Sequence, residues 1–285
     1  MVTRILATVV LGAAFLLGVS AERAQAAGGP AARMERVVTD PRDVESLQRG
    51  AKLFVNYCIN CHSAKYMRYN SLTNIGLTEQ QITENLILTG RFESGSDGAL
   101  QFVPSKIGET MHVTMPAAQS KAWFGTSPPD LSVEARVRGT QWLYNYLLGF
   151  YRDPQSVTGW NNVVFPNVAM PHALWELSGT NRLVTQEFAT HEEAEGAAIA
   201  AKALSVLEPG RDHKYLVKTL EVETPGAMST VQYRAAVADL VNFMDYVGEP
   251  SKLTRARLGI VVLLFLGVLF TLAYWLKREY WKDVH

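Results

Sequence analysis

The sequence predicts a mostly α-helical domain with insertions, followed by one membrane-spanning helix at the C-terminus. Three observations predict it. Apolar residues recur at helical spacing from residue 44 to residue 58 and again within 237–244. A run of 19 residues without charge, 258–276, is long enough to cross a bilayer. The only two cysteines of the 285-residue chain lie in one short motif, Cys58-Ile59-Asn60-Cys61-His62, at the end of the first helical run.

Composition excludes some classes of partner. The chain carries 27 basic and 27 acidic residues, so no excess positive charge points to nucleic acid. Hydrophobic residues make up 48% of the sequence, which is enough for a substantial core. If both cysteines hold a cofactor, no disulfide is available to stabilise the fold.

The N-terminus has the layout of a secretory signal peptide over residues 1–26. Arg4 precedes an uncharged apolar run at 5–19, and the small residues of Ala24-Gln25-Ala26 follow as a cleavage site. The run is short for a membrane span, although an uncleaved N-terminal anchor is the alternative. The sequence therefore predicts that the domain at 27–257 is exported.

The first mature helix leads into the cysteine motif. Asp43 is placed to cap its N-terminus. Apolar side chains then recur on one helical face, which must pack against the core and against whatever the motif binds: Val44, Leu47, Ala51, Phe54, Val55 and Cys58.

Cys58-Ile59-Asn60-Cys61-His62 is typical of covalent c-type haem attachment. Two thiols add to the two vinyl groups of a haem, and the histidine that follows can place an imidazole nitrogen on the iron. A thioredoxin-like redox pair is the first alternative, but it lies near a βαβ pattern that this sequence does not show. A zinc site is the second, but zinc needs four ligands and no second pair follows at the required spacing.

The stretch between residues 77 and 138 alternates helix and loop. A short helix is expected at 77–88 with Thr78 as its cap, and a loop at 90–108, where glycine and polar residues are frequent. Pro128 and Pro129 cannot continue a helix, so they predict a rigid extended segment. Asp130 or Ser132 is then expected to cap the next helix.

An electron carrier needs a second axial ligand on the iron, and the residues alone leave several candidates open. A thioether favours ferrous iron and raises the potential. Met67 is too close to His62 in sequence to reach the opposite face easily, and Met170 lies between two prolines that stiffen its loop. The candidates are Met67, Met111, Met115, Met170, His112, His172, His191 and His213.

Residues 177–228 form an insertion before the last helix of the soluble domain. Its acidic cluster, 191–195, is either a solvated helical face or a docking patch for a basic cytochrome c. Residues 216–222 are expected to form a strand. The last helix carries an apolar face over 237–244 and stops at Gly248-Glu249-Pro250.

The membrane helix is predicted at 258–276 and spans about 28 Å at about 1.5 Å per residue. Basic residues flank both of its ends, so the positive-inside rule does not orient it. The signal peptide does, because it exports the domain and leaves the tail at 277–285 in the cytoplasm.

Several motifs in combination resemble the cytochrome c1 family, the haem-c subunits of the cytochrome bc1 complex, and the bacterial form in particular. They are the single Cys-x-x-Cys-His, Pro128-Pro129-Asp130-Leu131-Ser132, the run from Tyr144 to Phe150, and Ala169-Met170-Pro171. The resemblance covers essentially the whole mature chain. It implies a c-type cytochrome domain, held in the periplasm by a single pass through the bacterial inner membrane.

The resemblance also implies roles for individual residues around one covalent haem c. Cys58 and Cys61 would carry the thioether bonds, His62 would be the proximal ligand and Met170 the distal ligand. The remaining implied residues are Pro128 and Pro129, on the histidine side of the haem, and Arg136, which would neutralise a haem propionate, with Arg138 as the alternative.

By the same resemblance, the chain is the electron-transfer subunit of ubiquinol–cytochrome c oxidoreductase and contributes no catalytic residue of its own. Its partners would be cytochrome b, the Rieske iron–sulfur subunit, which donates the electron, and a soluble cytochrome c, which accepts it. Two alternatives remain at this stage. One is a haem-c subunit of another respiratory complex such as a terminal oxidase, and the other is a haem-based gas sensor, which needs an open sixth position.

Overall fold

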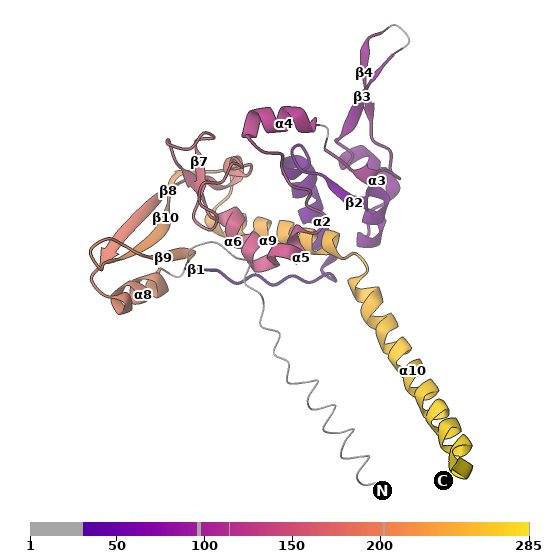
Figure 1. Cartoon of the computed structure of the whole chain (residues 1–285). Coiled ribbons are helices and arrows are strands. Elements are labelled where there is room, and N and C mark those ends of the chain that lie inside the picture. Colours follow the sequence, from indigo (N-terminus) through magenta and orange to yellow (C-terminus); the bar gives the residue numbers. More distant parts are fainter. Residues whose placement is uncertain (1–30, 96–97, 114, 202, 285) are drawn as a thin grey trace.

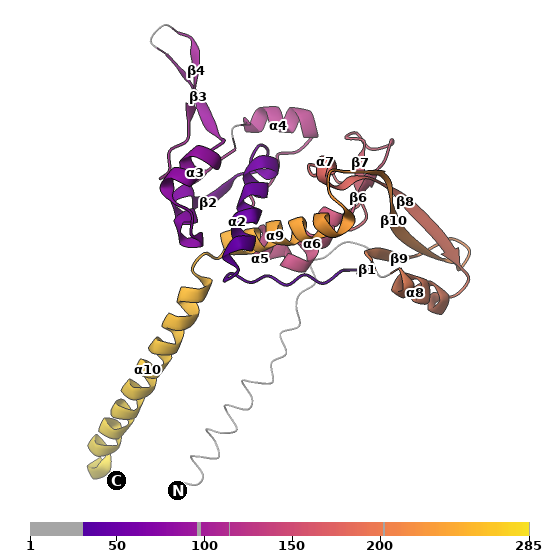
Figure 2. The ribbon, with the colours of Figure 1, turned by 180° about the vertical axis from the view of Figure 1, so that it is seen from behind.

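The structure is a computed structural model that describes residues 31–95, 98–113, 115–201 and 203–284 (Figure 1). The predicted signal peptide at 1–26 lies outside these residues. The described chain consists of a domain of helices and small antiparallel sheets, from which one long C-terminal helix projects (Figures 1 and 2).

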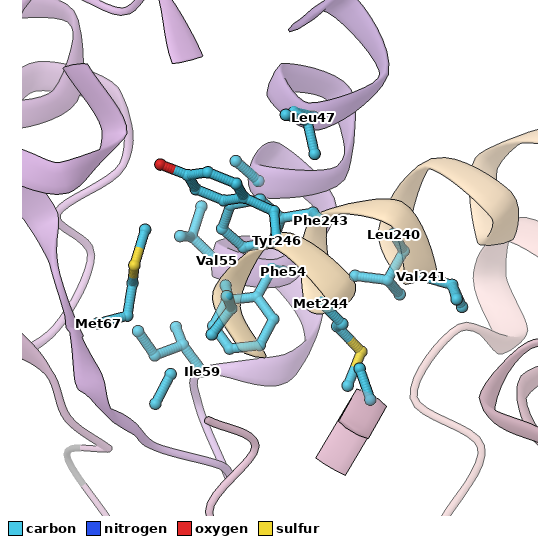
Figure 3. Packing of buried hydrophobic residues seen from close by; sticks show 14 of the residues in the cluster. Leu47, Phe54, Val55, Ile59, Met67, Leu240, Val241, Phe243, Met244 and Tyr246 are labelled. Carbon is cyan, nitrogen blue, oxygen red and sulfur yellow. The ribbon is translucent and has the colours of Figure 1, made fainter. Parts of the chain in front are cut away.

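Two crossing helices, α2 (Val44–Leu53) and α9 (Thr230–Gly248), form the centre of the core. Asp43 caps α2 by accepting a hydrogen bond from the Ser46 amide at 3.0 Å, as predicted. At the crossing, the ring of Phe54 packs against that of Phe243, with centroids 5.6 Å apart. Figure 3 shows how side chains from the two helices interdigitate.

The last helix of the soluble domain begins and ends where sequence signals place it. Ser229 and Gln232 form a reciprocal capping box at its start, and it ends at Gly248. Arg49 of α2 makes a two-pronged ion pair with Asp239 of α9, at 2.6 and 3.0 Å, which fixes the crossing from its outer side.

The chain between the cysteine motif and residue 111 corrects one prediction. A 3₁₀ helix (Tyr69–Ile75) and α3 (Glu79–Asn85) follow β2 (Ala64–Arg68), and Thr78 caps α3 through a capping box. The loop expected at 90–108 is wrong, because β3 (Gly90–Ser94) and β4 (Leu100–Pro104) form a projecting hairpin there (Figure 1). Phe92 and Phe102 pair across it with ring centroids 5.5 Å apart. This cross-strand contact stabilises the hairpin although glycine and polar residues are frequent in the segment. The element that follows is β5 (Thr110–Met111), which pairs with β2.

The segment after the two prolines leads into two short helices, α5 (Glu134–Arg138) and α6 (Thr140–Leu148). Neither Asp130 nor Ser132 caps α5, which corrects that prediction. Their side chains instead accept hydrogen bonds from the amides of Lys65 and Tyr66, at 3.0 and 3.1 Å. They therefore tie the proline segment to the strand that follows the cysteine motif. The neighbouring elements are α4 (Ala117–Phe124), β6 (Phe150–Arg152), β7 (Trp160–Asn162) and α7 (Trp175–Ser178).

The insertion builds most of a four-stranded antiparallel sheet in the order β1-β9-β10-β8. Its strands are β8 (Gly179–Phe188), β9 (Ser205–Pro209) and β10 (Tyr215–Pro225), joined at one edge by β1 (Ala31–Arg33). The strand expected at 216–222 is confirmed as part of β10. Helix α8 (His191–Ala200) packs on this sheet through buried Ala194 and Ala198, next to Val217.

The C-terminal helix α10 (Lys252–Tyr280) contains the whole predicted span at 258–276. Its most apolar 18-residue stretch has a mean hydropathy of 2.4, and no α10 side chain is buried among the described residues. It is the one helix in the described part of the chain that is long and apolar enough to cross a membrane.

Candidate haem site

A largely apolar cavity of about 290 Å³ lies where the proline segment, α5, α6 and the loop before α7 meet the cysteine motif and α9. Most of the residues singled out by sequence line it: Cys58, Cys61, His62, Pro128, Pro129, Arg138 and Met170. The structure thus brings together side chains that are separated by more than a hundred positions in the chain.

The backbone turn at the end of α2 aims the cysteine motif into the cavity. The helix widens into a π-helical turn (Phe54–Cys58), and the amides of Cys61 and His62 both donate to the carbonyl of Cys58, at 3.1 and 2.9 Å. This compact turn places both thiols and the imidazole at the same wall. Desolvation by the surrounding residues raises the pKa of the half-buried Cys58 to about 12, which keeps its thiol protonated.

The imidazole of His62 is held in one tautomer. Its Nδ1 lies 2.7 Å from the carbonyl oxygen of Pro129, and a carbonyl can only accept, so Nδ1 carries the proton. The lone pair of Nε2 is therefore available to a metal, the arrangement found in most metal-binding histidines. The residue is 8% exposed, and burial lowers its pKa, which favours the neutral, ligating form.

Short contacts fix the Pro129 carbonyl in place. The Leu131 amide donates to the Ser63 carbonyl at 2.7 Å, so the chain that follows the two prolines is tied to the residue after the cysteine motif. Burial pushes the pKa of Asp130 upward, but hydrogen bonds from Ser132 and Lys65 outweigh it and leave the pKa below its usual value. Asp130 is therefore a charged acceptor that holds this segment at neutral pH.

Met170 lies in the same cavity, and its sulfur already has one partner. The Tyr146 hydroxyl donates to the Met170 Sδ at 3.3 Å, and burial raises the pKa of that phenol, which keeps it protonated as a donor. Among the other methionines considered, Met67 and Met111 are buried in the core at 1% and 0% exposure, and Met115 is not among the residues described as lining the cavity.

The candidate histidines lie elsewhere. His172 is 3% exposed, stacks on Phe150 at 4.8 Å, and contacts the Ser178 hydroxyl through Nε2 at 2.8 Å. Burial lowers its pKa to about 4, so it is a neutral core residue. The side chains of His112, His191 and His213 are exposed.

The structure separates the two candidate arginines. Arg138 lines the cavity and lies over the rings of Trp142 and Phe165, at 4.6 and 5.7 Å. Arg136 is absent from the described lining, and its Nη1 lies 3.9 Å from a Glu249 carboxylate oxygen. Residues two apart on a helix face different directions, which explains why only one of the pair reaches the cavity.

Sequence reasoning missed the aromatic wall of the cavity. Trp142 and Tyr146 both line the cavity and stack with ring centroids 4.9 Å apart. Tyr146 also meets the buried ring of Phe150 edge-on at 5.2 Å. The spacing of four residues between Trp142 and Tyr146 was the available signal, because both lie on α6 and residues four apart share one face of a helix. By contrast, the acidic cluster at 191–195 lies on α8, beside the sheet and away from α4 and α6 (Figures 1 and 2).

The residues of the cavity fit a haem c. Imidazole nitrogen and thioether sulfur are established axial ligands, two thiols stand at attachment spacing, the walls are apolar, and one guanidinium can meet an acidic edge group. Fold and site together define a c-type cytochrome with a candidate membrane anchor.

The chain belongs to the cytochrome c1 family. The profile of the Cytochrome C1 family matches residues 35–199 and 219–284, and its gap lies within the insertion at 177–228. Haem c is therefore its cofactor and electron transfer its role, as predicted.

Three relatives illustrate the similarity. A protein named cytochrome c1 from Allochromatium vinosum is 40% identical over 274 residues, which cover 96% of this chain and 98% of the relative. A Nitrosomonas europaea protein named ammonia monooxygenase gamma subunit is 42% identical over 257 residues, 90% of this chain and 91% of the relative. Cytochrome c1 of Rhodospirillum rubrum is 28% identical over 249 residues, 85% of this chain and 83% of the relative.

Proposed function

We propose that this chain relays single electrons from the Rieske iron–sulfur subunit to a soluble cytochrome c within a ubiquinol–cytochrome c oxidoreductase. The observation that carries the proposal is the convergence of both cysteines, His62 and Met170 on one apolar cavity. The chain would supply no catalytic residue of its own, and cytochrome b would be its other partner in the membrane.

His62 and Met170 would hold the iron from opposite sides, and Cys58 and Cys61 would tether the porphyrin. Haem iron bound in this way takes up and releases one electron. With both axial positions filled by the protein, diatomic ligands are excluded, and a thioether ligand favours the ferrous state. Pro129 would orient His62 through its carbonyl, while Pro128 and Pro129 close the histidine side of the cavity.

Arg138 is the better candidate for pairing a haem propionate, in place of Arg136. It is the arginine among the described lining residues, and its stacking on Trp142 fixes the guanidinium plane. A positive charge here would also favour the reduced state of the iron, because it offsets one negative charge at the edge of the cofactor.

α10 would anchor the chain in the bacterial inner membrane, with the domain at 27–257 in the periplasm and the tail at 277–285 in the cytoplasm. The length and hydropathy of α10 support the anchor. The expected signal peptide at 1–26 supports the orientation. A single anchor of this kind would hold the haem at a constant height above the bilayer.

Two other functions compete with this proposal. One is membership of a different complex, either a terminal oxidase or the complex to which the relative named ammonia monooxygenase gamma subunit belongs. The other is a haem-based gas sensor. The relative named cytochrome c1 covers more of both chains at similar identity, which favours the bc1 complex. A gas sensor needs an open iron position, and Met170 inside the cavity argues against it.

Purification of the full chain from its native membranes tests the proposal. A C-terminal affinity tag and a mild detergent would recover the assembled complex, whose subunits are then identified by mass spectrometry. We expect cytochrome b and a Rieske protein in stoichiometric amounts. Recovery of oxidase or monooxygenase subunits in their place would contradict the proposed complex and leave the haem assignment standing.

A further inference from the structure

Two consecutive asparagines, Asn161 and Asn162, end strand β7 at the base of the loop that carries Met170. Asn162 is 0% exposed and Asn161 is 8% exposed. A buried amide side chain is costly unless it is hydrogen-bonded, so its partners indicate which parts of the structure it holds together.

The side chain of Asn162 joins helix α6 to the Met170 loop. Its Nδ2 donates to the carbonyl of Tyr146 at 2.7 Å. Its Oδ1 accepts from the amides of Val164 and Phe165, at 2.9 and 3.1 Å. One amide group therefore satisfies a carbonyl in the last turn of α6 and the first two free amides of the loop.

Asn161 fixes the other end of the same turn. Its Oδ1 accepts from the Asn167 amide at 2.8 Å, and its Nδ2 donates to Asp153 at 2.8 Å. Asn167 itself has a φ of 60°, a left-handed conformation that asparagine tolerates better than most residues. The turn is thus held at both ends just before Val168 and Met170, which line the cavity.

Tyr146 connects Asn162 to the sulfur of Met170. Its hydroxyl donates to the Met170 Sδ at 3.3 Å, while its carbonyl accepts from Asn162. The position of α6 relative to the loop therefore decides where the thioether lies. We propose that Asn162 is a positioning residue for the axial methionine: its amide locks the Met170 loop against α6 and so keeps the thioether on the haem iron. This inference rests on the proposed assignment of Met170 as a ligand.

The test uses the full chain, matured with haem and purified from membranes, as wild type and as Asn162→Ala. Two readouts report axial ligation directly. They are the weak red absorption band that a thioether gives to ferric haem, and the fraction of reduced haem that binds carbon monoxide. Asn242→Ala is the matched control, because Asn242 is also buried but donates to the Asp40 carbonyl and to the Ser46 hydroxyl of α2, away from the Met170 loop.

We expect both variants to unfold at a lower temperature than the wild type, since each leaves buried groups without partners. Only Asn162→Ala should also weaken the red band and raise the small carbon monoxide-binding fraction by roughly tenfold, the size expected when a buried polar group loses its partners. A variant that is less stable but keeps the red band and remains inert to carbon monoxide would overturn the inference, because Asn162 would then be structural only.

Asn162→Asp is the second variant, used for the same test if Asn162→Ala does not accumulate in the cell. The carboxylate keeps both acceptor contacts to the loop but places an oxygen against the Tyr146 carbonyl, so we expect partial loss of the red band. An unchanged band in this variant would also overturn the inference. A wild-type protein that lacks the band would instead refute the Met170 assignment itself, which distinguishes the two failures.

Discussion

Gly50 of α2 lies directly against the backbone carbonyl of Asp239 on α9, so closely that a Cβ at this position would collide with it. The helix that leads to the cysteine motif and the helix that closes the domain are therefore in backbone contact. This contact sets the height of the motif relative to α9, whose Leu240 and Met244 line the haem cavity. The position of the cysteine motif at the candidate haem cavity thus depends on the absence of a side chain at Gly50.

Gly50→Ala should therefore destabilise the domain although alanine is the better helix former. We expect a loss of about 1–3 kcal/mol or more, because the two helices must separate to accept the methyl group. Gly196→Ala on the exposed face of α8 is the matched control, since its new Cβ meets nothing within 4 Å and should stabilise by about 1 kcal/mol. Thermal unfolding of both variants measures the difference, and equal stability of the two would contradict the packing described here.

Replacing Arg138 with glutamine should lower the haem potential. Removing a positive charge beside the cofactor favours the oxidised state, and an interaction of about 1 kcal/mol corresponds to about 40 mV for one electron. Arg136→Gln should change the potential much less, because Arg136 is not among the described residues that line the cavity. A redox titration of both variants decides between the two arginines, and a larger shift in Arg136→Gln would restore that residue as the propionate partner.

Tyr146→Phe should lower the haem potential without freeing a coordination position on the iron. The hydroxyl withdraws electron density from the Met170 sulfur, so its loss makes the thioether a stronger donor to ferric iron. A hydrogen bond of about 0.5–1.5 kcal/mol corresponds to about 20–60 mV. The same titration measures this shift, and carbon monoxide should still fail to bind. A raised potential would show that the hydroxyl does not act on the sulfur.

Asp130→Asn should flatten the pH dependence of stability in acid. The folded state lowers the pKa of Asp130, so its contribution to stability is present above the usual range of an aspartate and is lost as the pH falls through the folded pKa. We expect the unfolding temperature of the wild type to fall more steeply than that of the variant between about pH 5 and pH 2. Parallel curves would mean that the folded state does not lower the pKa of Asp130.

The parts of this structure that sequence could predict are those specified by local signals. The cysteine motif, the caps at Asp43 and Thr78, and the uncharged run at 258–276 each depend on residues within a few positions of one another. Helical periodicity was sufficient to predict α2 and α9, because both bury one face.

The parts that sequence could not predict depend on long-range contacts or on exact helix phase. Strand β1 pairs with β9, so Ala32 lies opposite Val206, and nothing near either residue predicts the other. The choice between Arg136 and Arg138 requires knowing where α5 begins, and the absence of a side-chain cap at Val133 removes the local signal for that. The β3–β4 hairpin was hidden by its glycine and serine content.

The visible spectrum of reduced Met170→Leu under carbon monoxide tests the central claim most directly. Leucine fills similar volume but offers no lone pair, so we expect the haem to stay covalently attached, the potential to fall, and carbon monoxide to bind at the vacated position. The wild type, measured alongside, should remain inert to carbon monoxide. The contrary result is a Met170→Leu protein that keeps the potential of the wild type and whose spectrum carbon monoxide leaves unchanged. It would show that another residue occupies the sixth coordination position of the iron, and it would contradict the site described here.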